Sequence, residues 1–254
     1  MNFNGKVAIS TGAASGMGLL FAKEFARLGG NIVLCDINKD KIEEIANEIN
    51  KENNGKALAV YCDVRDYNQV VNVREKAVET FGRIDIVANF AGGTAVRMRQ
   101  VDREKYKEFP DVPIEVYDWG LDVNLKGPFY FAHVMMKQMR EQKSGLIVNL
   151  GSITGMEGDG YGLEYPTAKS GLMFGFTKSL AQAGAKHGIR AVCVSPGPVL
   201  TREAMAGMKT LLGRAADPQE IIDLILFVAS EKGQFINGEN IMIDGGRNAM
   251  ERCK

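Results

Sequence analysis

The segment Thr11-Gly12-Ala13-Ala14-Ser15-Gly16-Met17-Gly18 decides the fold of this chain of 254 residues. It lies between a short apolar run, residues 7–10, and an amphipathic stretch of helical spacing, residues 16–28. Glycines in such a strand-to-helix turn let backbone amides approach a pyrophosphate, and the helix N-terminus adds about half a positive charge. A turn that only needs positive φ would also contain glycines, but the order of strand, turn and helix favours a phosphate-binding turn.

Short β-branched runs alternate with longer stretches of helical period along the chain, which is typical of βαβ units and a parallel sheet. We expect strands at residues 7–10, 31–35, 57–62, 84–89, 146–150, 190–195 and 241–243. We expect helices at residues 16–28, 39–53, 67–81, 116–140, 165–186 and 218–229. Because no repeat or linker interrupts the pattern, we predict one α/β domain over residues 1–254. Its architecture is a Rossmann-type, doubly wound parallel sheet of about seven strands with helices on both faces.

Composition and charge exclude several classes of protein. The chain is 45% hydrophobic and 24% charged, and its 31 basic and 31 acidic residues cancel. It therefore lacks the excess of basic residues that a nucleic-acid-binding surface requires. No apolar run reaches the roughly 20 residues that cross a bilayer, and the N-terminus lacks the pattern of a secretory signal. We expect a cytoplasmic protein without nucleic-acid or membrane partners.

The cysteines and histidines do not have the spacing of a metal site. Cys35, Cys62, Cys193 and Cys253 contain no Cys-x-x-Cys pair, and the chain has 2 histidines. Neither a zinc site nor a disulfide framework is indicated, and we predict that no metal is bound. Three thiols are expected to pack with the strands, and the fourth lies in the C-terminal tail.

Two segments depart from the regular alternation, and both follow expected strands. Residues 92–113 are charged and include Arg97, Arg99 and Arg103, whereas residues 196–216 are rich in Gly, Pro and Met. Ligands of open α/β sheets bind beyond the carboxyl ends of the strands, where loops vary. We predict that both segments form walls of a substrate site. The alternative for the first segment is a solvated, charged excursion.

Asp36 ends the second expected strand, 24 residues after Gly12. A carboxylate at this place accepts hydrogen bonds from the adenosine ribose of a dinucleotide and would repel a 2′-phosphate. Lys39 and Lys41 are close enough in sequence to attract such a phosphate, yet Asp36 favours NAD over NADP as the cofactor. The alternative role of Asp36 is a cap for the next helix, although Asn38 already suits that role.

Four polar residues are candidates for catalysis. Tyr165 and Lys169 are four residues apart in an expected helix, so both side chains can face one ligand, and a nearby ammonium favours the ionised form of a phenol. Ser152 follows the strand at residues 146–150, where its hydroxyl can hold a carbonyl. Asn124 lies inside a long apolar helix, where an amide is unfavourable unless it bonds or bends something. Taken singly, each residue has an ordinary structural explanation.

Together these residues carry a family resemblance. The set Thr11-Gly12-x-x-x-Gly16-x-Gly18, Asn89-Phe90-Ala91-Gly92, Asn124, Ser152, Tyr165-x-x-x-Lys169 and Pro196-Gly197 resembles the short-chain dehydrogenase/reductase family in order and spacing. The resemblance extends from about Gly5 to Arg247. It implies an NAD-dependent oxidoreductase that transfers hydride between the cofactor and a secondary alcohol or ketone. Phe90 replaces the usual second Asn of its motif, a change in packing that removes no expected catalytic group.

The resemblance also implies roles for individual residues. Tyr165 is the expected general acid/base, Lys169 lowers its pKa and bonds the nicotinamide ribose, and Ser152 orients the reacting carbonyl. Asn124 is expected to hold a water that links Lys169 to solvent, and Asn89 to brace the sheet beside the cofactor. The residues implied in cofactor binding, with Asp63 and Val64 at the adenine, are Gly12, Ser15, Gly16, Met17, Gly18, Asp36, Ile37, Asp63, Val64, Asn89, Ala91, Gly92, Tyr165, Lys169, Pro196, Gly197 and Val199.

The residues that follow the candidate serine suggest a substrate class. A wall rich in hydrogen-bond acceptors is formed, with interspersed glycines, by Thr154, Glu157, Asp159, Tyr161 and Glu164. Sugars, polyols or related hydroxy compounds would satisfy these groups, unless the carboxylates simply face water. Met205 and Met208 add apolar surface, which leaves hydroxysteroids and 3-hydroxyacyl thioesters as alternatives.

Two further hypotheses concern turnover and assembly. A chain that binds NAD without turnover would act as a scaffold or sensor, although an intact set of Asn, Ser, Tyr and Lys argues against this. The expected helix from Tyr165 carries Leu172, Met173, Phe174 and Phe176, so its apolar side chains point in more directions than one sheet can cover. We therefore expect a homo-oligomer, either a tetramer or a dimer.

Overall fold

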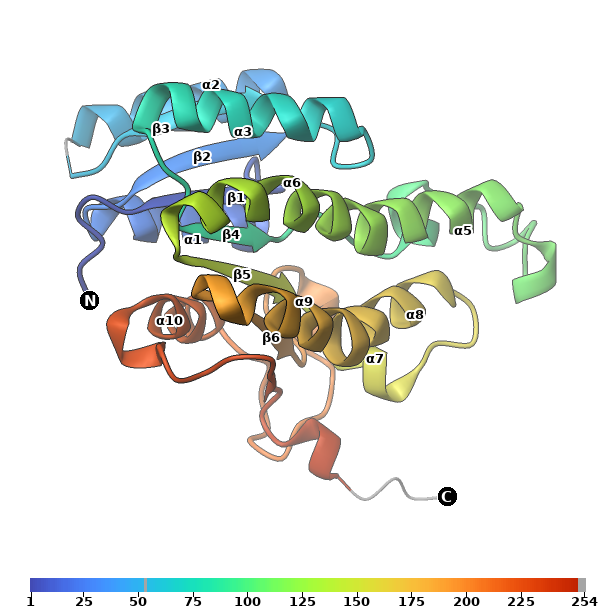
Figure 1. Cartoon of the computed structure of the whole chain (residues 1–254). Coiled ribbons are helices and arrows are strands. Elements are labelled where there is room, and N and C mark those ends of the chain that lie inside the picture. Colours follow the sequence, from blue (N-terminus) through green and yellow to red (C-terminus); the bar gives the residue numbers. More distant parts are fainter. Residues whose placement is uncertain (53, 251–254) are drawn as a thin grey trace.

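The molecule is organised around one parallel sheet. In this computed structural model, which describes residues 1–52 and 54–250, seven strands lie in the order β3-β2-β1-β4-β5-β6-β7 (Figure 1). The strands are β1 (Val7–Thr11), β2 (Asn31–Asp36), β3 (Ala57–Tyr61), β4 (Ile86–Asn89), β5 (Gly145–Leu150), β6 (Ile189–Pro196) and β7 (Asn240–Ile243). Every predicted strand is present, and the predicted doubly wound parallel sheet is confirmed.

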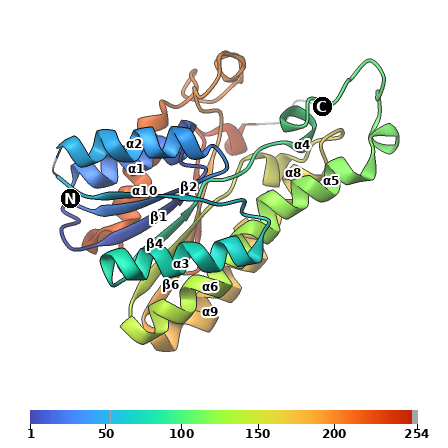
Figure 2. The same ribbon diagram turned by 90° about the horizontal axis from the view of Figure 1, so that it is seen from above.

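Helices cover both faces of this sheet. Figure 2 shows α1 (Gly16–Arg27), α2 (Lys39–Glu52) and α10 (Pro218–Ala229) on one face, opposite α3 (Tyr67–Phe81), α6 (Gly127–Gln142) and α9 (Thr177–Gly184). The remaining helices are α4 (Ala95–Met98), α5 (Ile114–Leu121), α7 (Thr154–Glu157) and α8 (Glu164–Gly171). In both views, α5 and α8 lie side by side beyond the carboxyl ends of the strands. The predicted end of α2 at Asn53 lies outside the described residues.

Two apolar layers form the core, one on each face of the sheet. On one face, Phe21 and Phe25 of α1 pack with Ile45 of α2. On the other face, Val73 of α3 and Phe131 of α6 pack against strand side chains. Because the strands are buried on both faces, their sequences are nearly continuous apolar runs rather than alternating patterns.

Two helices that the sequence predicts as continuous are each divided by a π-helical turn. The predicted helix at residues 116–140 consists of α5, a π turn over Asp122–Lys126, and α6. The predicted helix at residues 165–186 consists of α8, a π turn over Leu172–Phe176, and α9. The sequence therefore predicts the two helical regions correctly but does not predict the π turn that divides each of them.

Side chains that bond to helix carbonyls accompany both π turns. The Asn124 amide donates to the carbonyl oxygen of Gly120 at 2.8 Å, and Pro128 has no N–H to donate to the Asn124 carbonyl four residues earlier. In the second turn, the Thr177 hydroxyl donates to the carbonyl oxygen of Leu172 at 2.6 Å. Turns of this kind often lie at functional sites, and Asn124 is one of the residues predicted to act in catalysis.

The strand order places a crevice at the carboxyl edge of the sheet. β1 and β4 are neighbours in the sheet, and the chain winds outward from them in opposite directions. Ligands of open α/β sheets bind where the winding direction reverses.

Cys35, Cys62 and Cys193 are buried as free thiols, as expected, whereas Cys253 lies outside the described residues. Within residues 1–52 and 54–250, no helix has the length and apolar character needed to span a membrane.

Candidate active site

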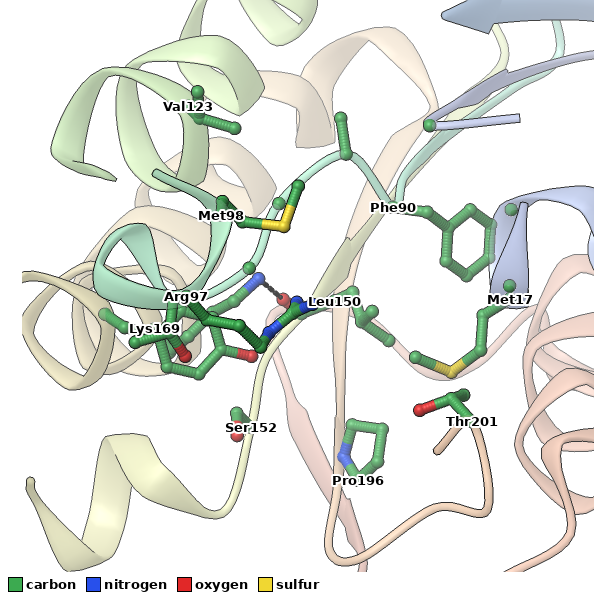
Figure 3. Close-up of a pocket in the computed structure, with 18 of the residues that line it drawn as sticks. Met17, Phe90, Arg97, Met98, Val123, Leu150, Ser152, Lys169, Pro196 and Thr201 are labelled. Carbon is green, nitrogen blue, oxygen red and sulfur yellow. Dashed lines mark hydrogen bonds between the residues drawn. The ribbon is translucent and has the colours of Figure 1, made fainter. Parts of the chain in front are cut away.

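A cavity of about 620 Å³ lies beyond the carboxyl ends of the strands, where the sequence predicted a ligand site. Small-molecule sites have volumes of roughly 300–1,000 Å³. Figure 3 shows side chains that line it from distant parts of the chain, among them Met17 of α1, Phe90 after β4, Ser152 after β5 and Pro196 of β6. The sequence-predicted residues that line the cavity are Gly12, Ser15, Gly16, Met17, Gly18, Asp36, Ile37, Asp63, Val64, Ala91, Gly92, Ser152, Tyr165, Lys169, Pro196, Gly197 and Val199.

The glycine turn forms one wall of the cavity and leaves the start of α1 free to bind an anion. Ser15 precedes the helix without a side-chain capping bond, and the first turn of α1 contains no acidic residue. The first backbone N–H groups and the partial positive charge of the helix therefore have no counter-charge from this turn. Gly16 has φ +56°, and a Cβ at Gly18 would lie 2.5 Å from the carbonyl oxygen of Gly12, so both positions need glycine.

Asp36 is fixed at the end of β2 by two backbone hydrogen bonds. Its carboxylate accepts from the N–H groups of Ala14 (3.0 Å) and Asn38 (2.9 Å) and lines the cavity. The Asn38 side chain, in turn, accepts from the N–H of Lys41 at 3.2 Å and caps α2. Asp36 therefore joins the glycine turn to the following loop and presents its charge to the cavity.

Asp63, which follows β3, contributes a second carboxylate to the same half of the cavity. Its oxygens accept from the Arg65 guanidinium at 2.5–3.1 Å, and this partner holds the pKa of the Asp63 carboxyl below its ordinary value. The Arg65 guanidinium also lies 5.9 Å from the ring centroid of Trp119. The charges of Asp63 and Arg65 thus largely neutralise each other.

Ser152, Tyr165 and Lys169 converge at the other end of the cavity. Tyr165 is the second residue of α8, so Pro166 falls in the first turn, where a helix tolerates proline. Lys169 lies one turn later, is only 3% exposed, and donates from Nζ to the carbonyl oxygen of Leu150 at 2.7 Å (Figure 3). Burial lowers the pKa of Lys169 from 10.5 to about 8.

The role of Lys169 in lowering the pKa of Tyr165 stays a prediction, and the surroundings of the phenol and the amine bear on it. Burial raises the pKa of the Tyr165 phenol, and the groups that oppose this effect are the Ser152 hydroxyl and then Arg97 and Arg202. The amine of Lys169 lies 5.5 Å from the centroid of the Tyr165 ring, over the ring face. Its Nζ donates to the backbone carbonyl oxygen of Leu150, a partner that the four-residue spacing does not predict.

Asn124 and Asn89 lie outside the lining of the cavity. The Asn124 amide accepts from the N–H of Gly93 (2.9 Å) and donates to the carbonyl oxygens of Gly93 (2.9 Å) and Gly120 (2.8 Å). It therefore fixes the loop that follows β4. Asn89 donates to the side-chain oxygen of Asn149 at 3.0 Å in the buried part of the sheet. The water relay through Asn124 and the bracing role of Asn89 stay predictions.

Comparison with known proteins agrees with this geometry. The family model described as short chain dehydrogenase matches residues 6–210. The chain belongs to the short-chain dehydrogenase family. The 3-oxoacyl-[acyl-carrier-protein] reductase FabG of Thermotoga maritima is 34% identical over 260 residues, which cover 97% of this chain and 99% of that protein. The meso-2,3-butanediol dehydrogenase of Serratia marcescens is 31% identical over 99% of this chain and 98% of that protein.

A solved structure is also similar over nearly the whole chain. The crystal structure of a short-chain type dehydrogenase/reductase from Mycobacterium marinum is 30% identical and has a TM-score of 0.87, covering 98% of this chain and 97% of that chain. As a short-chain dehydrogenase, this protein is an oxidoreductase that acts on CH–OH groups with a nicotinamide dinucleotide. The residues present fit that cofactor, because the uncapped start of α1 offers N–H groups to a pyrophosphate and Asp36 offers acceptors to a ribose.

The acceptor-rich substrate wall expected of this short-chain dehydrogenase is only partly present, with Thr154 and Asp159 lining the cavity. Glu157 pairs with Arg247 at 2.9 Å, and Glu164 is buried and accepts from the N–H of Ala95 at 2.8 Å. Of the three predicted carboxylates, Asp159 alone lines the cavity. The other two satisfy a cation and a backbone donor that are distant in sequence, so no local pattern could reveal their use.

Two arginines line the catalytic end of the cavity: Arg97, which the sequence places only within a predicted wall segment, and Arg202, which the sequence does not single out. Arg97 comes from α4 and Arg202 from the segment after β6, which confirms that residues 92–113 and 196–216 supply cavity walls. Arg97 therefore does not belong to a purely solvated excursion. Arg97 lies eight residues after Asn89, where the buried strand β4 ends, and this position was the available signal.

Proposed function

We propose that this chain is an NAD-dependent dehydrogenase that interconverts a secondary alcohol and a ketone in a small molecule. The observation that carries the proposal is the convergence of Ser152, Tyr165 and Lys169 at one end of a cavity whose other end contains the glycine turn and Asp36. A dinucleotide that bridges these ends would have its nicotinamide beside Tyr165. When bound, the cofactor supplies the hydride acceptor or donor.

The contacts of the three catalytic residues support distinct tasks. Tyr165 exchanges one proton with the substrate oxygen, and its raised pKa favours the protonated phenol that donates to a ketone at neutral pH. Ser152 accepts a hydrogen bond from the Thr154 hydroxyl at 2.8 Å, which leaves its own proton free for the substrate oxygen. Lys169, which donates to the carbonyl of Leu150, would hold the ribose next to the nicotinamide. The protein thus orients the carbonyl and manages one proton.

The charges around Asp36 support NAD rather than NADP. Its carboxylate would repel a 2′-phosphate and can accept from ribose hydroxyls. The nearby cations Lys39 and Lys41 form ion pairs with Glu43 (3.8 Å) and Glu44 (2.8 Å), and neither lysine lines the cavity. Because each of these two lysines is already paired with a carboxylate, neither offers an unpaired cation to an incoming 2′-phosphate.

The proposed function is tested by measuring oxidation and reduction with NAD(H) and NADP(H). The substrate panel contains sugars, polyols, hydroxysteroids and 3-hydroxyacyl thioesters with their ketones. Tyr165→Phe is expected to lower kcat by roughly 10²- to 10⁴-fold, because it removes the proton that is transferred. Its Kd for NAD, measured by calorimetry, is expected to stay within a few-fold of the wild-type value. Tyr61→Phe is the control, since the Tyr61 side chain is exposed outside the cavity.

Two outcomes of this experiment would overturn parts of the proposal. Near-normal turnover by Tyr165→Phe would refute the role of its phenol. NAD binding without turnover of any alcohol or ketone would instead support a scaffold or sensor.

We also propose that the protein is a homo-oligomer, a dimer or a tetramer. Phe129 of α6 and Phe176 of the neighbouring π turn stack with their ring centroids 5.5 Å apart. Phe129 and Phe174 are exposed on these helices, and a second copy of the chain would cover them. Light scattering that gives the mass of a single chain would refute this assembly.

A further inference from the structure

The catalytic end of the cavity carries positive charge that no carboxylate pairs with among the described residues. Arg97 and Arg202 line it together with Lys169, whereas Asp159 is the carboxylate on this side. Within residues 1–52 and 54–250, neither arginine has a carboxylate oxygen within the 4.0 Å of an ion pair. The Arg202 guanidinium contacts the sulfur of Met205 at 3.7 Å. Both guanidinium groups are therefore available to a ligand.

The two guanidinium groups line the same cavity as the phenol of Tyr165, and they come from different walls. Arg97 projects from α4 and points into the cavity among the side chains drawn in Figure 3. Partial desolvation in the cavity and then the charge of Arg202 lower the pKa of Arg97. Burial raises the pKa of Tyr165, and both arginines oppose that rise. Like charges that face one cavity repel each other, and an anion bound between them would relieve this repulsion.

The position of Arg97 is fixed by the elements that carry the catalytic groups. Glu164, the first residue of α8, is 3% exposed and accepts through Oε1 from the N–H of Ala95, the first residue of α4. Gly93, just before α4, is held by two hydrogen bonds of 2.9 Å to the Asn124 amide. The short helix that presents Arg97 is therefore anchored to α8 and to the π turn, which makes it a preorganised wall.

We propose that Arg97 and Arg202 bind an anionic group, a carboxylate or a phosphate, on the alcohol or ketone that this enzyme converts. The inference deepens the proposed function and rests on it, because it names the substrate class of the same site. A guanidinium matches the geometry of both anions through paired hydrogen bonds. The cofactor pyrophosphate has its own site at the start of α1, at the other end of the cavity. The substrate is therefore a hydroxy acid or a hydroxy phosphate rather than a neutral polyol or steroid.

The kinetic test compares anionic substrates with matched neutral ones. The carboxylate arm uses 3-hydroxybutyrate and its methyl ester, and the phosphate arm uses glycerol 3-phosphate and glycerol. The wild-type enzyme is expected to prefer the anion by at least about 10-fold in kcat/KM, and Arg97→Gln or Arg202→Gln to reduce that preference by roughly 10- to 100-fold. Arg99→Gln is the matched control, because Arg99 is exposed just after α4 and does not line the cavity.

A binding measurement keeps the test independent of turnover. Trp119 is the single tryptophan of the chain and lines the cavity, so its fluorescence can report ligand binding to the NAD-saturated protein. We expect 3-hydroxybutyrate or inorganic phosphate to bind roughly 10- to 100-fold more weakly to Arg97→Gln than to Arg99→Gln. The Kd of NAD should be the same in both variants.

Three results separate this inference from the proposed function. Equal use and equal binding of anionic and neutral compounds by the wild-type protein would overturn the inference alone. A weaker NAD affinity in Arg97→Gln, with unchanged anion binding, would overturn it too, because the arginine would then serve the cofactor. Arginine-dependent anion binding without turnover of any compound would support the anion site and refute the proposed dehydrogenase activity.

Discussion

The substitution Lys169→Met is expected to change how the stability of the protein depends on pH. The amine is 3% exposed, and its pKa in the folded chain is about 8, against an ordinary value of 10.5. Between these pH values the unfolded chain holds a proton on Lys169 that the folded chain has lost. Stability rises with pH wherever the unfolded state binds more protons. The free-energy cost of burying the charged amine therefore lowers the stability of the folded chain in full below pH 8. This cost disappears as the pH approaches 10.5.

The size of this effect follows from the lowered pKa. At 1.36 kcal/mol per pKa unit, the difference corresponds to about 3 kcal/mol. The free energy of unfolding of the wild type, minus that of Lys169→Met, should thus increase by about 3 kcal/mol from below pH 8 to pH 10.5. Loss of the hydrogen bond to Leu150 adds a constant offset of about 1–3 kcal/mol, without changing the slope.

Urea denaturation at a series of pH values measures this difference. Subtracting the two curves removes the titration of thiols and phenols that both proteins share. Lys178→Met is the matched control. It removes the same amine from an exposed position on α9, where burial cannot depress the pKa of the amine. A difference curve for Lys169→Met that is flat across this range would refute the argument that burial depresses the pKa of the amine.

Three further predictions test the cofactor half of the cavity and its surroundings. Gly18→Ala adds a Cβ 2.5 Å from a backbone oxygen of the turn and is expected to weaken NAD binding at least about 10-fold in calorimetry. Gly160→Ala is the control, because its Cβ meets nothing within 4 Å. Equal NAD affinities of the two variants would contradict the reasoning. Asp36→Asn removes the charge that repels a 2′-phosphate, so the ratio of kcat/KM for NADPH over NADH should rise about 10-fold, and an unchanged ratio would count against the NAD assignment. Glu157→Gln breaks the partly exposed pair with Arg247 and should lower the free energy of unfolding by about 0.5–1 kcal/mol; a loss of several kcal/mol would show that this pair does more than join two segments.

The interrupted helices show where sequence reasoning about this protein reaches its limit. The helical period around Asn124 was visible, and the unfavourable amide suggested that it bonds or bends something. The structure shows that it does both, by donating to Gly120 in a π turn that Pro128 favours. The partner Gly93 could not be foreseen, because it belongs to another loop and is brought close only when α5 packs against α4.

The sequence by itself determined the parallel sheet, the glycine turn, Asp36 at the end of β2, and the presence of Ser152, Tyr165 and Lys169 at the edge of the sheet. These features depend on neighbouring residues, on apolar periodicity and on the conformational freedom of glycine. Only the tertiary structure decided which charges face the cavity.

Contacts between distant segments explain that division. Glu157 is neutralised by Arg247, 90 residues away. Arg97 from α4 and Arg202 from beyond β6 line one cavity, and neither has an ion-pair partner in the part of the chain that the structure describes. Burial likewise sets the pKa of Lys169, although the spacing of the motif suggests only its proximity to the phenol. Charge compensation and desolvation depend on how the whole chain packs, because they are set by all the groups around a site rather than by adjacent residues.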